Sequence, residues 1–336
     1  MNYPTESRAI QRAINASRNT LVVSHANPDA DAVAALLAFR GVFIGPTREI
    51  TLALGEGTIP ETLVFLKDLD TIEPFNAVDP DDYDLLVLLD CADEDRVGEH
   101  AGLVIRSLAG RVPVINIDHH VTNSRFGSIN LIDADAAATC EILALLFEDL
   151  GVEIDASLAT TLLTGIQGDT LGLRTPSTTG QTLDVSADLL RAGADLDRVV
   201  DYLFRIRPYS TLKLWAHALG ATSFTGELIW TEITSQMLED SGADESEAEG
   251  IVNFLAGTRG ARAAALLYRK DDGWRVSMRS LSDEVDVSQL TSLFGGGGHS
   301  RAAGCSLTGG LELRNEFLET VASRIARDSA PVSVSG

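Results

Sequence analysis

Continuous apolar runs separated by amphipathic stretches alternate along the first two thirds of the chain. The runs at residues 21–23, 84–89 and 112–117 predict strands that are buried on both faces. Periodic apolar positions predict helices over residues 6–17, 140–150, 157–164, 180–192 and 196–214. This alternation is typical of an α/β protein whose parallel sheet is covered by helices on both faces.

The pattern changes beyond residue 220 and predicts a second, smaller α/β lobe. Residues 221–234 read as strands, 245–255 as a helix, and 263–268 with 274–279 as a hairpin around Asp271-Asp272-Gly273. An apolar segment at 287–294, a glycine-rich turn, a strand at 302–307 and a helix at 311–326 complete the lobe. We therefore expect a first domain over 1–195, a helical linker over 196–220 and a second domain over 221–330, with the active-site cleft between the two lobes.

Composition and charge narrow the possible partners. The chain has 26 Lys and Arg residues and 49 Asp and Glu residues, so its net charge is 26 − 49 = −23. The resulting electrostatic field repels polyanions and argues against binding of long duplex nucleic acid. A short phosphorylated ligand needs only a local positive site, which metal ions can supply. No run of about 18 apolar residues predicts a membrane span, the first 20 residues predict no export signal, and three scattered cysteines fit a reducing compartment. We expect a soluble cytoplasmic protein.

Acidic and histidine side chains follow the predicted strands directly. His25, Asp29 and Asp31 lie within one seven-residue segment shortly after the first apolar run, and Asp90 follows the second. The triplet Asp118-His119-His120 follows the third, and a further acid, Asp169, stands in Thr164-Gly165-Ile166-Gln167-Gly168-Asp169-Thr170. Open α/β sheets place ligand sites at the carboxyl ends of their strands, so we expect these side chains to converge.

This set of side chains is suited to metal ions. Oxygen and imidazole ligands without cysteine fit Mn²⁺, Mg²⁺ or Zn²⁺, and many carboxylates favour the harder ions. Eight candidate ligands are too many for one ion, and two ions about 3.5–4 Å apart would form a site for metal-assisted phosphoester hydrolysis. The alternative for any single acid is a helix N-cap, which Asp118 in particular could be.

At these residues the chain resembles the DHH phosphoesterase superfamily, over nearly its whole length. His25-x-x-Pro28-Asp29-x-Asp31-Ala32 is similar to the first motif of that family, Asp90 to the second, Asp118-His119-His120-x-x-Asn123 to the third and Asp169-Thr170 to the fourth. In the second lobe, Ser277-Met278-Arg279-Ser280 and Gly295-Gly296-Gly297-Gly298-His299-x-x-Ala302-Ala303-Gly304 resemble the DHHA1 domain. Together the motifs resemble stand-alone oligoribonucleases and pAp phosphatases.

The resemblance implies a role for each matching residue. His25 and Asp29 would hold one metal ion, Asp31, His119 and Asp169 the other, and Asp90 would bridge them. His120 would contact the scissile phosphate and Asp118 would orient the histidines, so the implied catalytic residues are His120, Asp118 and Asp90. The implied substrate contacts are Asn123, Arg279, Ser280, Gly296, Gly297, Gly298 and His299.

The resemblance implies hydrolysis of short oligoribonucleotides and linear dinucleotides such as pApA to mononucleotides, with removal of the 3′-phosphate of pAp. The implied cofactors are two divalent cations, Mn²⁺ first and Mg²⁺ or Co²⁺ after it, and a homodimer is left open. Alternatives are a cyclic di-AMP phosphodiesterase, a RecJ-like single-strand exonuclease, a pyrophosphatase and a non-catalytic nucleotide sensor. The chain departs from the family pattern at Ala34-Ala35, at Gly168 and at Leu171-Gly172-Leu173-Arg174, none of which is an implied metal ligand.

Overall fold

The computed structural model describes residues 2–282 and 284–328 and divides the chain into two compact units. The first runs from Met1 to Ile206 and the second from Arg207 to Gly336, so the division lies inside the predicted linker, 196–220. The last two residues of the predicted second domain, 329 and 330, lie outside the described residues. Among the described residues, no helix combines the length and apolar character needed to cross a bilayer.

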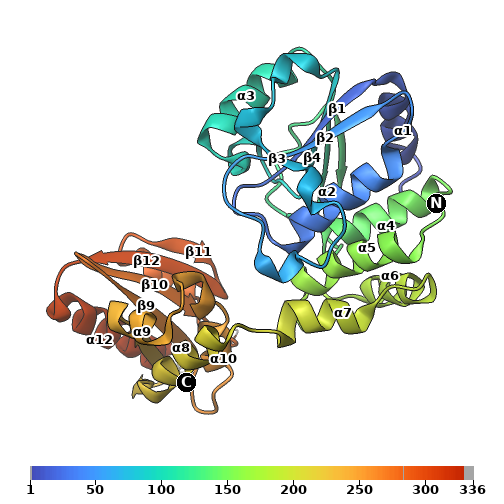
Figure 1. The fold of residues 1–336 in the computed structure, drawn as a ribbon. Helices are drawn as coiled ribbons and strands as arrows, with labels where there is room; N and C mark the ends of the chain where they lie inside the picture. The colour runs from blue at the N-terminus through green and yellow to red at the C-terminus, as the bar shows by residue number, and fades with distance from the viewer. Residues whose placement is uncertain (1, 283, 329–336) are drawn as a thin grey trace, which may run out of the picture. The chain divides into compact units, whose positions relative to one another are not determined.

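A six-stranded parallel sheet forms the centre of the first unit (Figure 1). Its strands follow the spatial order β3-β2-β1-β4-β5-β6, and every neighbouring pair is parallel. The α/β class with a parallel first sheet is therefore confirmed. The strands are β1 (Asn19–Ser24), β2 (Glu49–Leu54), β3 (Ile72–Pro74), β4 (Leu85–Leu89), β5 (Val114–Asp118) and β6 (Ile129–Ile132).

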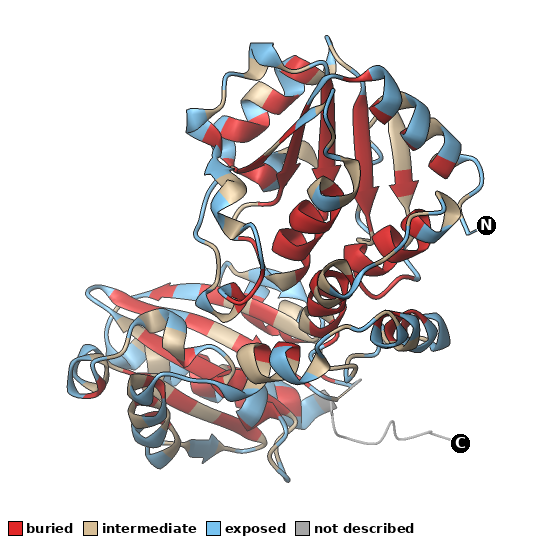
Figure 2. Cartoon of the chain, turned by 45° about the vertical axis from the view of Figure 1, so that its right-hand side comes forward, coloured by how far each residue is buried: buried red, intermediate tan, exposed pale blue. Residues whose placement is uncertain are grey.

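Helices cover both faces of this sheet because successive strand side chains point to opposite sides. Val22 and Val87 pack against α2 (Ala30–Phe43), α4 (Thr139–Asp149) and α5 (Ala156–Asp169). Leu21 and Leu86 instead join the core beneath α3 (Glu99–Ala109). Figure 2 shows buried positions, in red, along the strands and the adjacent helices. The unit also contains α1 (Glu6–Ala16), α6 (Gly180–Arg191) and α7 (Leu196–Val200).

The second unit is built on a mixed sheet in the order β11-β12-β10-β9-β8-β7. Only β8 and β9 run parallel, and one apolar core lies on each face of the sheet. The strands are β7 (Ser223–Thr225), β8 (Leu228–Ile233), β9 (Ala263–Lys270), β10 (Gly273–Arg279), β11 (Gly297–His299) and β12 (Ala302–Thr308). The helices are α8 (Tyr209–Gly220), α9 (Ser235–Ser241), α10 (Ile251–Ala256), α11 (Val287–Ser292) and α12 (Leu311–Asp328).

Several predicted elements differ from the structure. The single helix predicted over 196–214 is wrong: α7 passes into a π-helical turn that ends at Arg205, and α8 begins only after Pro208. Proline lacks an N–H and disfavours helical geometry in the residue before it. The helix predicted over 245–255 is broken at Gly250, where φ is +89°. The predicted glycine-rich turn contains the edge strand β11.

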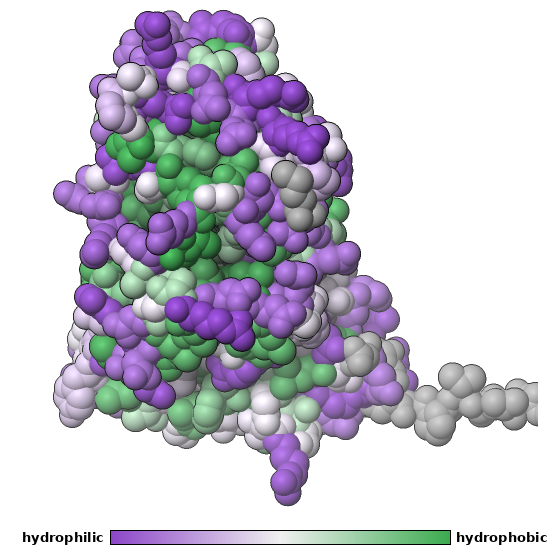
Figure 3. Space-filling view, turned by 90° about the vertical axis from the view of Figure 1, so that its right-hand side faces the viewer, coloured by the Kyte–Doolittle hydropathy of each residue, from purple (hydrophilic) through white to green (hydrophobic). Residues whose placement is uncertain are grey.

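The surface reflects the acidic composition of the chain. Polar and charged side chains cover much of the face shown in Figure 3, with apolar side chains visible between them. A net charge of −23 gives this surface a negative field, so anionic ligands are attracted only where cationic groups or bound cations reverse that field locally.

Candidate metal centre

The predicted metal ligands lie where the strand order of the first sheet reverses. Strand β1 has β2 on one side and β4 on the other, so the connections leave β1 and β4 in opposite directions along the sheet. His25 follows β1, Asp90 follows β4 and Asp118 ends β5. The carboxyl ends of neighbouring strands at such a reversal form the usual ligand site of an open α/β sheet.

The turn after β1 is held by the loops that follow β2 and β4. The N–H of Ala26 donates to the Arg96 carbonyl at 2.7 Å, and the N–H of Asn27 donates to the Glu56 carbonyl at 2.9 Å. Asn27 has φ of +52°, a conformation that asparagine tolerates better than most residues. The turn therefore directs His25 and Asp29 by backbone bonds that need no bound ion.

Asp29 is both the N-cap of α2 and a candidate ligand. Its Oδ1 accepts the N–H groups of Asp31 and Ala32 at 3.0 Å each. Its Oδ2 lies 3.9 Å from His25 Nε2, and about half of the side chain, 53%, is exposed. One oxygen therefore caps the helix while the other stays accessible to an ion.

Asp90 is placed between three histidines. Its Oδ2 lies 3.3 Å from His25 Nε2, and its Oδ1 lies 3.5 Å from His119 Nε2 and 3.6 Å from His120 Nδ1. The residue is only 2% exposed and has φ of +56°, an uncommon conformation for a residue other than glycine. Strained, buried side chains of this kind cluster at functional sites.

The ligand-type atoms form adjoining groups in which all donors lie within 4.8 Å of one another. One group contains His25, Asp29 and Asp90, and another contains Asp31, His119 and Asp169. A third contains Asp90, Asp118, His119 and His120, so it shares Asp90 with the first group and His119 with the second. Carboxylate and imidazole donors in this number fit divalent cations, and two neighbouring sets of three fit two of them.

The same geometry shifts the pKa values of the histidines. Burial would lower the pKa of His25, but its bond to Asp90 and the charge of that carboxylate outweigh burial and raise the pKa to about 9. Burial would likewise lower the pKa of His119, but the bond to Asp169 and the charges of Asp31 and Asp90 raise it to about 10. Without a cation, the cluster therefore holds protons in the place of positive ions.

The crowding of charged groups also shifts the pKa values of the carboxylates. Burial, followed by the charges of Asp90 and Asp169, raises the pKa of Asp31 well above its usual range. Burial acts in the same direction on Asp90, but the bond to His25 and the charges of the three histidines lower its pKa overall. Like charges buried this close are stable only with positive partners, which divalent cations would provide.

His120 is oriented by a buried polar chain. Its Nδ1 lies 2.7 Å from Asp118 Oδ1, and this bond, ahead of the opposing effect of burial, raises the pKa of His120. The other oxygen of Asp118 accepts from Asn123 Nδ2 at 2.6 Å, and the same amide donates to Asn116 Oδ1 at 2.8 Å. The Asn123 amide, predicted as a substrate contact, is thus directed at Asp118, and Asp118 accepts from side chains instead of capping a helix.

Sequence reasoning missed three residues that hold this cluster. Thr139 begins α4 and contacts two of the carboxylates. Asn116 lies fully buried in the middle of β5 and donates to the Cys91 carbonyl at 3.1 Å. Gly165 in α5 is so close to Asp31 that a Cβ there would lie 2.5 Å from Asp31 Oδ1. The one available signal was Asn116, a polar residue inside an otherwise apolar run.

Two predicted substrate contacts of the second unit share one row of its sheet. Arg279 in β10 and His299 in β11 both pair with Ala302 of the intervening strand β12. His299 is exposed, and Arg279, partly buried, donates from Nη1 to the Met278 carbonyl at 2.9 Å. Burial lowers the pKa of Arg279, although a guanidinium remains charged. The guanidinium of Arg279 and the imidazole of His299 therefore lie in one row toward the β11 edge of the sheet.

The other predicted contacts of the second unit have packing roles. Ser280 is 2% exposed, and its hydroxyl donates to the backbone carbonyls of Arg262 and Ser282. A Cβ at Gly296 would lie 2.2 Å from the Gly304 carbonyl oxygen, and one at Gly298 would lie 2.6 Å from that of Ala302. These glycines allow β11 to approach β12. Gly297 differs because its Cβ position meets open space.

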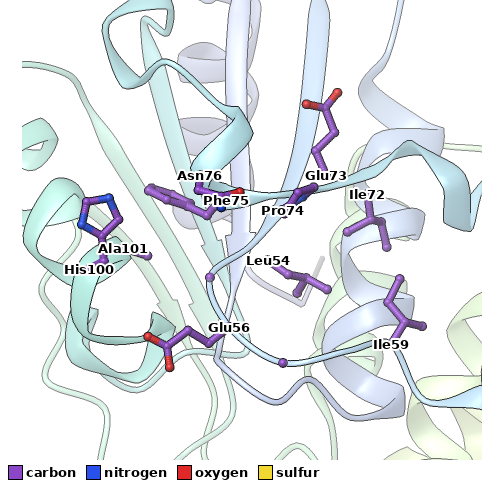
Figure 4. Close-up of a pocket in the computed structure, with 12 residues that line it drawn as sticks. Leu54, Glu56, Ile59, Ile72, Glu73, Pro74, Phe75, Asn76, His100 and Ala101 are labelled. Carbon is purple, nitrogen blue, oxygen red and sulfur yellow. The ribbon is translucent and has the colours of Figure 1, made fainter.

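A separate cavity of about 460 Å³ opens at the ends of β2 and β3 (Figure 4). It is lined by apolar side chains such as Ile59 and Ile72 and by Glu56, Glu73 and His100. None of the predicted metal ligands is among its lining residues. The loop that forms one wall also supports the turn after β1 through the Glu56 carbonyl. The cavity therefore adjoins the cluster without being part of it.

Comparison with known proteins identifies matches to both units. A sequence model of the DHH family, N-terminal domain, matches residues 19–166, and one of the DHHA1 domain matches residues 230–327. A relative from Thermus thermophilus named bifunctional oligoribonuclease and PAP phosphatase NrnA is 32% identical, over 97% of this chain and 96% of the relative. A Bacillus subtilis relative of the same name is 25% identical, over 88% of this chain and 91% of the relative.

A solved structure supports the fold over nearly the whole length. An exopolyphosphatase-related protein from Bacteroides fragilis is 19% identical and superimposes with a TM-score of 0.88, covering 96% of each chain. At this identity the likeness concerns the fold alone. Both units described here therefore recur together in a known protein.

Proposed function

Because the chain belongs to the DHH family and carries a DHHA1 domain, it is a hydrolase of phosphoester bonds, and we propose that it is a Mn²⁺-dependent phosphodiesterase of short oligoribonucleotides. Its products would be mononucleotides, and its substrates would include linear dinucleotides such as pApA. Removal of the 3′-phosphate from pAp is part of the same proposal. The observation that carries it is the pair of adjoining three-donor groups, which a third group connects through Asp90 and His119.

The division of labour among the metal ligands follows the two groups. His25 and Asp29 would hold one cation and Asp31, His119 and Asp169 the other. Asp90, which lies 3.3 Å from His25 and 3.5 Å from His119, would be the ligand shared between them. Such ions supply Lewis-acid stabilisation of a phosphoryl group and a water that is acidic enough to react near neutral pH. Mn²⁺ accepts a mixture of imidazole and carboxylate ligands, which this set provides.

His120 acts on the substrate phosphate. Because its Nδ1 bonds to Asp118, Nε2 is the nitrogen left for a phosphoryl oxygen or a leaving group. The bond to Asp118 raises the pKa of His120 and so favours its protonated form, and the side chain is 34% exposed and open to a ligand. A charged donor at this position stabilises negative charge as it develops on the phosphate.

Short substrates fit the charge of the chain and the named activities of its relatives. The Thermus and Bacillus relatives are both named bifunctional oligoribonuclease and PAP phosphatase. A net charge of −23 opposes a long polyanion. Arg279 and His299 would bind a phosphate or nucleotide group of the substrate.

The test is product formation from pAp, pApA, a five-nucleotide RNA, long single-stranded DNA, cyclic di-AMP and pyrophosphate, each with Mn²⁺ and with chelator. We expect Mn²⁺-dependent mononucleotide release from pApA and the short RNA. Asp90→Asn should abolish turnover, whereas Asp135→Asn, at an exposed acid of the same unit, should not. Cleavage confined to cyclic di-AMP, long DNA or pyrophosphate would select that alternative, and binding without turnover would select the sensor.

A further inference from the structure

Helix α4 begins without a cap from its own sequence. The residue before it is Ala138, which makes no side-chain cap, and two further alanines, Ala136 and Ala137, precede it. The first N–H groups of a helix need partners when they are buried, and Thr139, the first residue of α4, is fully buried. The partners must therefore come from elsewhere in the fold.

Asp31 of helix α2 is that partner, although it lies 108 residues away in the sequence. The N–H of Thr139 donates to Asp31 Oδ2 at 2.6 Å, and the N–H of Cys140 donates to Asp31 Oδ1 at 3.0 Å. Each oxygen of the carboxylate is thus fixed by one N–H at the positive end of a helix. This contact sets the plane of the Asp31 carboxylate and leaves each oxygen a further lone pair.

The hydroxyl of the same residue contacts a second carboxylate. Thr139 Oγ1 donates to Asp90 Oδ1 at 3.1 Å. Threonine is stiff about χ1, so the hydroxyl is held in one direction relative to the helix. The rings of His25, His119 and His120 lie 3.3–3.6 Å from the same carboxylate. A hydroxyl stays protonated throughout the pH range of the folded protein, so Thr139 is a constant donor.

We propose that Thr139 is a positioning residue of the metal centre, which holds Asp31 through its backbone N–H and Asp90 through its hydroxyl. One residue at the start of α4 thereby fixes two carboxylates that belong to different metal-ligand groups. The inference rests on the proposed two-metal function. Groups that orient metal ligands commonly change metal affinity or activity about 10- to 100-fold when they are removed.

The test separates the hydroxyl from the backbone bond. Thr139→Val keeps the shape and the N–H but removes the hydroxyl, and Thr139→Ser restores the hydroxyl. Thr161→Val is the matched control, because Thr161 is also buried and its hydroxyl donates to the Ser157 carbonyl one turn earlier in α5. Mn²⁺ affinity is measured by titration calorimetry, and the melting temperature is measured in chelator and in Mn²⁺.

We expect Thr139→Val to bind Mn²⁺ about 10- to 100-fold more weakly and to lose most of the Mn²⁺-induced rise in melting temperature. Thr139→Ser should recover most of the affinity, and Thr161→Val should bind like the wild type. Unchanged affinity in folded Thr139→Val overturns the proposal, as does equal weakening in the control. If Thr139→Val does not fold, Thr139→Ala is judged by the same criterion. Wild-type protein that binds Mn²⁺ but cleaves no substrate in the panel overturns the proposed activity and leaves the Thr139 proposal standing.

Discussion

Helix α5 can bring Asp169 to the metal cluster only because Gly165 has no side chain. A Cβ at Gly165 would lie 2.4 Å from Cys140 Sγ and 2.5 Å from Asp31 Oδ1, well inside van der Waals contact. Substitution by alanine would normally stabilise a helix interior by about 1 kcal/mol. Overpacking at such distances costs about 1–3 kcal/mol, because neighbouring groups must shift. The net change for Gly165→Ala is therefore a destabilisation of up to about 2 kcal/mol.

The same substitution at Gly41 provides the control. Gly41 lies in α2, is exposed, and has no heavy atom within 4 Å of its Cβ position. Gly41→Ala should therefore show only the helix-propensity gain of about 0.5–1 kcal/mol. For a unit of this size, about 1 kcal/mol corresponds to about 2–4 °C in melting temperature. We expect Gly41→Ala to melt a few degrees higher and Gly165→Ala several degrees lower, both measured in chelator.

The two variants should also differ in metal binding. The methyl group of Gly165→Ala displaces Asp31 Oδ1, an oxygen of a predicted metal ligand, and a displacement of about 1 Å in an active site can lower a rate about 100-fold. We expect weaker Mn²⁺ binding and slower turnover for Gly165→Ala, with both unchanged for Gly41→Ala. If the two variants were equally stable and bound Mn²⁺ equally, α5 could not approach Asp31 as closely as the structure describes.

Three further predictions follow from the geometry. Asn123→Leu removes a hydrogen-bond donor from the buried Asp118 carboxylate and should lower kcat about tenfold or more, with little change in KM. A raised KM with unchanged kcat would instead indicate that Asn123 contacts the substrate. In chelator, the protonated forms of His25 and His119 stabilise the fold fully below pH 6.5, and this stability is lost as pH rises through their pKa values of about 9 and about 10. Mn²⁺ affinity should therefore rise over the same pH range, because Mn²⁺ binding releases these protons. Titration calorimetry in buffers of different ionisation enthalpy measures the number of protons released, and an affinity that does not change with pH would contradict the prediction. Gly298 has φ of +139°, and a Cβ there would lie 2.6 Å from the Ala302 carbonyl oxygen. Gly298→Ala should therefore destabilise the second unit by about 1–3 kcal/mol in scanning calorimetry, whereas Gly297→Ala should not.

The strands and ligands that could be predicted from sequence are those with a local signature. Strand β4 is a continuous apolar run, and β5 is apolar apart from Asn116 until its last residue. An acid stands at the end of each, Asp90 after the first and Asp118 as the last residue of the second. Strands β2, β3 and β6 were missed, and the last two, of three and four residues, are too short to show a period. The strand order that brings β1 beside β4 depends on long-range pairing, which no local pattern contains.

The supporting residues of the cluster could not be predicted for the same reason. Thr139 and Gly165 are ordinary helix residues in the sequence, and their roles arise only when α4 and α5 pack against the start of α2. Asn123 shows the opposite case, because the motif identified the residue but not the direction of its amide. Sequence therefore located the carboxylates and imidazoles, whereas the groups that aim them depend on tertiary contacts.

Two of the predicted metal ligands are also the caps of the helices around them. Asp29 caps α2 from within its own chain segment, and Asp31 caps α4 from another helix. A carboxylate at the positive end of a helix is stabilised by the helix dipole, which offsets part of the cost of burying like charges together. Because the same bonds that begin the helices also fix the directions of the carboxylates, the fold can set ligand geometry before a cation binds. We therefore expect metal affinity to depend on the packing of α2, α4 and α5 as well as on the identity of the ligands.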